Sequence, residues 1–246
     1  MNDSLRHRMD DVHGRVDDAT GAINDALAEI KPRLRGWLHA GIAPLALAAG
    51  IVLVVLSPDA TTRVGSAVFA LSALVLFTVS AVYHRGSWSP TAQEVLRRFD
   101  HSNIFVLIAG TLTPFALLLL DGSDRWTMLA ISWGGAIGGV VLKVLWGGAP
   151  RWLSVPVYVA LGWAPVFFFG DFVEGAQQLG AGMGTAVIAL ICVGGALYTL
   201  GGVVYGTKFP DPSPRWFGFH EVFHTFTILA FVSHYVGVSL ATYSLR

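Results

Sequence analysis

The stretch GFHEVFH, residues 218–224, contains two histidines four residues apart, His220 and His224. Residues at i and i+4 lie on the same face of a helix, so both imidazoles can reach one metal ion, and imidazole nitrogens favour zinc and its neighbours. With Glu221 between them, the stretch also matches H-E-x-x-H, the zinc-metalloprotease pattern. The residues therefore raise three hypotheses: a zinc protease, another zinc enzyme, or a chance pair of histidines in a membrane helix.

The position of Glu221 argues against the protease hypothesis. Adjacent residues on a helix are rotated by about 100°, so we interpret Glu221 as a partner of a lipid head group or a loop rather than as a catalytic base. Proteases with this pattern take their third ligand from further along the chain. No Asp or Glu follows His224. A third ligand must therefore come from upstream.

Other polar residues interrupt apolar segments, where buried ionisable groups are costly and are functional candidates. Ser80 and His84 close one such segment, Asp100 and His101 open the next, and His234 lies further along the last. His84 would complete a three-histidine site, the arrangement that leaves a fourth position of a catalytic zinc open for water. A single histidine of this kind is more often a helix-end or interfacial residue than a metal ligand. His101 and His234 are interpreted as hydrogen-bonding or interfacial residues.

The composition indicates an integral membrane protein. Of its 246 residues, 54% are hydrophobic and 13% are charged, whereas soluble domains carry about 25% charged residues. A membrane-spanning helix needs about 20 mostly apolar residues, and seven such segments predict an all-α, seven-transmembrane helix bundle. The net charge is zero, so no nucleic-acid partner is expected. The predicted spans are 38–57, 64–84, 101–120, 127–146, 152–171, 184–206 and 219–241.

Every second connection between the spans is rich in basic residues, and this alternation predicts how the protein is oriented in the membrane. We expect the N-terminus in the cytoplasm and the C-terminus outside. The inner ends of the second, third and seventh spans then bring His84, Asp100 and His220 to one level, with Ser80 and His224 about 6 Å deeper at 1.5 Å per residue. All five residues fall in one slab near the cytoplasmic face. The basic residues on that side are Lys31, Arg33, Arg35, Arg85, Arg97, Arg98, Lys143, Arg151, Lys208 and Arg215.

Residues 1–36 are expected to form a separate element. Their apolar residues fall on one helical face and aspartates occupy much of the remainder. The pattern predicts a cytoplasmic amphipathic helix, which either lies on the membrane surface, forms a short coiled coil or rests on the bundle. The predicted organisation is therefore this segment followed by a seven-transmembrane, zinc-binding domain over residues 37–246.

Five ordered motifs give the chain a family resemblance. Over about residues 37–241 it resembles the hemolysin III family, within the progestin and adipoQ receptor group and the wider alkaline-ceramidase-like superfamily of membrane hydrolases. Leu112 departs from the pattern, since members often carry Tyr there. The motifs are SAVYHR (80–85), LRRFDHSNIFVLIAGTLTPF (96–115), LGW (161–163), GGVVYG (201–206) and GFHEVFH (218–224).

The resemblance implies a zinc ion held by His84, His220 and His224. It further implies that Asp100 holds the zinc-bound water and that Ser80 is a polar group beside the metal or the substrate. Similar proteins are described as hemolysins, as receptors and as regulators of membrane state. The family resemblance therefore leaves the activity open.

Two functions are weighed for these residues. The first is hydrolysis of a lipid amide of the ceramide type, which enters laterally from the membrane, with Asp100 as general base and zinc or Ser80 stabilising the oxyanion. The second is a non-enzymatic receptor or regulator of membrane lipid homeostasis with a structural zinc. A pore is not expected, because no span carries a repeated polar stripe. The sequence gives no oligomeric state.

Overall fold

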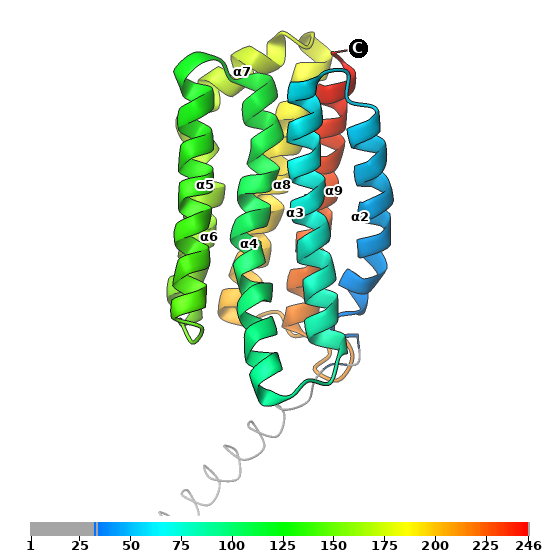
Figure 1. Cartoon of the computed structure of the whole chain (residues 1–246), viewed down its shortest axis with the longest axis vertical. Helices are drawn as coiled ribbons and strands as arrows, with labels where there is room; N and C mark the ends of the chain where they lie inside the picture. Colours follow the sequence, from blue (N-terminus) through cyan, green and yellow to red (C-terminus); the bar gives the residue numbers. More distant parts are fainter. Residues whose placement is uncertain (1–31, 33, 246) are drawn as a thin grey trace, which may run out of the picture.

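A computed structural model describes residues 32 and 34–245 as a bundle of helices standing side by side (Figure 1). Seven segments are long and apolar enough to cross a membrane, which confirms the predicted fold class. Within the described residues no strand forms, and a single β-bridge joins Ser213 and Phe217. The helices are α2 (Trp37–Val55), α3 (Ala60–Arg85), α4 (Pro90–Leu119), α5 (Gly122–Leu145), α6 (Arg151–Gly162), the 3-10 helix η1 (Ala164–Phe168), α7 (Phe169–Gln177), α8 (Ala181–Thr207) and α9 (Phe219–Tyr243).

Helix α4 begins earlier than the predicted span 101–120. Ser89 caps it by accepting a hydrogen bond from the backbone N–H of Ala92, and Pro90 occupies the first position, where its missing N–H costs nothing. The first turns are polar and lie outside any apolar window. Asp100 therefore lies well inside a helix rather than at its start, which fixes its backbone rigidly.

The fifth predicted span, 152–171, is not one continuous helix. It consists of α6, the short η1 and α7. Pro165 lies at the start of η1, and its ring and missing N–H disfavour continuation of an α-helix. Hydropathy predicted the span correctly but not this interruption.

Helix α4 is the centre of the bundle. In its most apolar window 72% of residues are buried, more than in any other described span, and it contacts α3, α5, α6, α7 and α9. Beside it, Phe69 and Phe77 of α3 pack their rings against Phe231 of α9. The burial of these aromatic side chains and the contacts between their rings hold α3 against α9. Helix α3 carries His84, and α9 carries His220 and His224.

Residues 32 and 34–36 lead into α2, where 34–36 form a turn. The amphipathic helix predicted for residues 1–36 otherwise lies outside the described residues, and the domain division at residue 36 stays a prediction. The side of the membrane on which each terminus lies also stays a prediction. The structure shows that α2 and α9 begin at the same end of the bundle (Figure 1), where the backbone N–H of Leu34 donates to the carbonyl of Trp216.

Candidate metal centre

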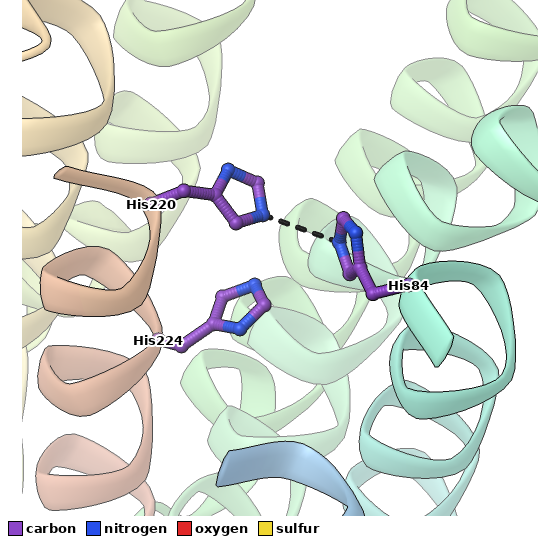
Figure 2. Close-up of side chains that lie close together, drawn as sticks. All are labelled: His84, His220 and His224. Atoms are coloured by element: carbon purple, nitrogen blue, oxygen red, sulfur yellow. Dashed lines mark hydrogen bonds between the residues drawn. The ribbon is translucent and has the colours of Figure 1, made fainter. Parts of the chain in front are cut away.

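Three buried histidines meet where α3 ends and α9 begins (Figure 2). His84 lies in the last turn of α3, and His220 and His224 lie on adjacent turns at the start of α9. The Nε2 atoms of His84 and His220 are 3.2 Å apart, and one ring nitrogen from each histidine lies within 4.8 Å of the other two. The arrangement can hold a metal ion.

The ring nitrogens fit a metal ion in both spacing and chemistry. Two nitrogens bound to one tetrahedral ion at 2.0–2.1 Å stand roughly 3.3 Å apart, close to the distance between His84 and His220. Nδ1 of His224 is buried and has no hydrogen-bond partner within residues 32 and 34–245. Three imidazoles without a thiolate are a donor set for transition metals rather than for calcium or magnesium.

Asp100 and Ser80 lie beside the three histidines, in the slab that the sequence predicted. Oδ2 of Asp100 is 3.6 Å from Nε2 of His84, and the Ser80 side chain interacts with the Asp100 carboxylate. Both residues are buried. Together with His220 and His224 they line one end of a cavity that extends into the bundle. A carboxylate, a hydroxyl and histidines that could hold a metal ion thus face a common space.

Glu221 is a loop partner, as predicted, and does not reach a lipid head group because its side chain is completely buried. One carboxylate oxygen accepts a hydrogen bond from the backbone N–H of Gly218 at 2.8 Å, and the other forms an ion pair with Arg35 at 3.0 Å. Burial makes such a pair costly to break. Glu221 therefore fixes the first turn of α9 and ties the entrance of α2 to it.

His39 of α2 is a buried residue beside the metal centre that sequence reasoning missed. Its ring stacks on that of His224 with 3.8 Å between centroids and an angle of 14°. In the part of the chain that the structure describes, neither of its ring nitrogens has a hydrogen-bond partner. His39 lines the same cavity as Asp100. The sequence signal was an ionisable group within the first span. Its neighbour could be identified only after α2 was placed against α9.

We expect His39 to position His224 through ring packing. His39→Phe keeps an aromatic ring against His224 and should leave metal affinity within a few-fold of the wild type. His39→Ala removes the ring and should weaken metal binding about 10–100-fold, as loss of a supporting group does elsewhere. Competition with a chromogenic chelator measures both affinities. Equal affinity in the alanine variant and the wild type would show that the stack does not support the site.

Two further histidines in the described part of the chain, His101 and His234, lie outside the three-histidine cluster. Nε2 of His101 is 3.5 Å from the hydroxyl of Tyr205. His234 lies deep in the bundle, where its Nε2 meets the carbonyl of Ile191 at 3.2 Å. The interpretation of both as hydrogen-bonding residues is confirmed. His234 is buried rather than interfacial.

Comparison with known proteins assigns the family. A family model described as Haemolysin-III related matches residues 27–235. The chain is 35% identical over 153 residues to a Hemolysin-3 homolog of Bacillus subtilis, covering 62% of this chain and 68% of the relative. It is 23% identical over 208 residues to the human monocyte to macrophage differentiation factor, covering 82% and 80%. It is 25% identical over 185 residues to a progestin and adipoQ receptor-like protein of Caenorhabditis elegans, covering 70% and 42%.

The matched stretch covers most of the chain and includes the positions of all three clustered histidines, Ser80 and Asp100. Seven helices able to cross a membrane agree with the integral membrane character of this group. The chain therefore belongs to the hemolysin III family of integral membrane proteins, which is related to the progestin and adipoQ receptors.

Proposed function

We propose that this protein is a zinc-dependent hydrolase of lipid amide bonds. The proposal is carried by one observation: the Asp100 carboxylate lies 3.6 Å from the three-histidine cluster at the head of a cavity. At a structural metal a carboxylate serves only as a support of the ligands. A hydrolase needs a base close to the position where water attacks.

The residues of the chain have distinct roles in this mechanism. His84, His220 and His224 would hold the zinc, which when bound supplies a Lewis acid for water and carbonyl oxygen. Asp100 accepts the proton of the attacking water at a carboxylate oxygen and then passes it to the amide nitrogen as the C–N bond breaks. Ser80, next to Asp100, orients the carboxylate or donates a hydrogen bond to the oxygen on which negative charge develops.

The walls of the cavity favour a lipid substrate. Beyond the polar end they include Leu76, Ile104, Leu107, Ile108 and Leu112, which suit an acyl chain. The space open to the centres of water molecules measures about 100 Å³, against the ~10–15 Å³ that one water needs. The amide bond as the target is proposed from the resemblance of the motifs to the alkaline-ceramidase-like hydrolases.

A structural metal in a non-enzymatic membrane regulator is the second candidate. One observation favours it: α3 and α9 share few close backbone contacts, and a metal between His84 and the histidines of α9 would join them. Buried metal binding contributes directly to the stability of the folded state. In that case the Asp100 carboxylate would only support the ligands.

Purified protein in lipid nanodiscs can separate the two functions. We expect about one zinc per chain by elemental analysis. We also expect release of fatty acid and amine from at least one member of a panel of ceramides and other N-acyl lipids. A chelator should stop this release and added zinc should restore it. Stoichiometric zinc without hydrolysis of any lipid amide would favour the structural metal.

A further inference from the structure

A second group of polar residues lies deep in the cavity, away from the metal centre. It consists of Thr111 on α4, Tyr198 on α8 and His234 on α9, all of which line the cavity. The Thr111 hydroxyl, the Tyr198 hydroxyl and Nδ1 of His234 are buried and have no hydrogen-bond partner among the described residues. Thr111 is 2% exposed and His234 is 5% exposed. We call these three residues the deep polar cluster.

The cluster lies about 15 Å along the bundle from the metal centre. At 1.5 Å per residue, His234 is about 15 Å beyond His224 on α9, and Thr111 is about 16 Å beyond Asp100 on α4. Tyr198 is likewise about 10 Å from Tyr205 along α8, and Tyr205 lies beside His220. Each of these residues therefore lies about two to three turns from a residue at the metal centre on its own helix, and the contact between the Tyr198 and His234 rings brings the side chains together. The side chains between are mostly apolar.

The hydrogen bond of His234 fixes what its free nitrogen can do. A backbone carbonyl only accepts, so Nε2 donates to the carbonyl of Ile191. In the neutral ring expected without a charged partner, Nδ1 is then an acceptor. The ring is held in place because it packs on Gly194, where a Cβ would collide with it. Nδ1 therefore carries a lone pair in a fixed position, on a ring that lines the cavity.

The hydroxyls of Thr111 and Tyr198 complete the cluster. The Tyr198 ring lies 5.6 Å from that of His234, and its hydroxyl interacts with Thr111 without the geometry of a hydrogen bond. Each hydroxyl can donate and accept. One acceptor and two hydroxyls match an alcohol group, which donates to Nδ1 and accepts from the hydroxyls. A carboxylate would repel the Nδ1 lone pair. A plain alkyl chain would leave Nδ1 of His234 without a donor, even where the two hydroxyls pair with each other.

We propose that the deep polar cluster recognises a hydroxyl group on the chain of a lipid whose polar end lies at the metal centre. The cavity would thus select hydroxylated acyl chains by the distance between their two polar groups. The placement of a carboxyl or amide group at the metal centre rests on the proposed function. Recognition of the hydroxyl itself needs no hydrolysis.

Binding of fatty acids tests the proposal, because they match the acyl product and are not hydrolysed. Hexadecanoic acid and hexadecanoic acids with one hydroxyl, stepped along the chain, would compete with a fluorescent fatty acid on the zinc-loaded protein. We expect one position in the far half of the chain to bind about five- to tenfold tighter than the unsubstituted acid, the gain of a satisfied buried hydrogen bond. Thr111→Val and Tyr198→Phe should each abolish most of this preference while still binding the unsubstituted acid.

Matched controls remove hydroxyls elsewhere. Thr185→Val loses a hydroxyl that is bonded to its own helix on the exposed face, and Tyr235→Phe loses one bonded to the carbonyl of Ala49; both should keep the positional preference. Equal binding of all the acids by the wild type would overturn the proposal and leave the cluster as a site for water. Preference retained in both Thr111→Val and Tyr198→Phe would also overturn it. The proposed hydrolysis can fail in its own assay without changing these affinities.

Discussion

Asp100→Asn is expected to abolish hydrolysis of the lipid amide while the protein keeps its metal. Asparagine has the shape of aspartate but cannot accept the proton of the attacking water, and loss of a general base costs about 10²–10⁴-fold in rate. The three imidazoles that could hold the metal are unchanged. Loss of a carboxylate at 3.6 Å from His84 should lower the affinity for the metal by at most about 10–100-fold. Values of kcat/KM and zinc per chain, measured on the same sample, test both parts.

Asp121→Asn is the matched control for this substitution. Asp121 follows α4, and its side chain is 98% exposed and pairs only with Arg125 among the described residues. Its variant should keep the hydrolysis rate and the zinc content. If Asp100→Asn retained the wild-type rate, the base would have to be another group. If it lost the metal together with the activity, Asp100 would be a support of the ligands, as the non-enzymatic function requires.

The depth of the site could be predicted from the sequence because helices in a membrane constrain it. Seven apolar segments with alternating basic connections bring the end of one helix level with the start of the next, and the 1.5 Å rise converts residue numbers into depth. This reasoning placed His84 and Asp100 level with His220, and the structure brings them together. The polar first turns of α4 and the interruption at Pro165 were missed, because hydropathy does not report capping or a local 3-10 turn.

The sequence could not predict which faces of the separate helices pack against one another. His39 was visible as an ionisable residue in the first span, but its stacking on His224 depends on how α2 packs against α9. The deep polar cluster joins residues from α4, α8 and α9 that have no sequence pattern in common. Helical periodicity tells which residues share a face of one helix. It does not tell which faces of separate helices meet.

Replacing any one of His84, His220 and His224 with alanine is expected to remove the metal. Two imidazoles would remain. The loss of metal affinity should exceed the roughly 10–100-fold loss that follows removal of a hydrogen-bonding partner of a ligand. A metal that binds only the folded state stabilises it by about 4 kcal/mol at 1,000 times its Kd. The wild type should therefore gain thermal stability when zinc is added after dialysis against a chelator. The three variants should show neither this gain nor stoichiometric zinc.

His234→Asn is the control for loss of a buried histidine from α9. This residue lies about 15 Å from His224 along the helix, so its variant should bind zinc and gain stability as the wild type does. Helical content and a single peak in size-exclusion chromatography establish that each variant is folded before zinc is added. Zinc-dependent stabilisation that survived in a folded His84→Ala protein would place the metal on α9 alone. With the metal on α9 alone, α3 and α9 would be held together by the packing of Phe69 and Phe77 against Phe231. Asp100 would then no longer lie beside a metal ligand.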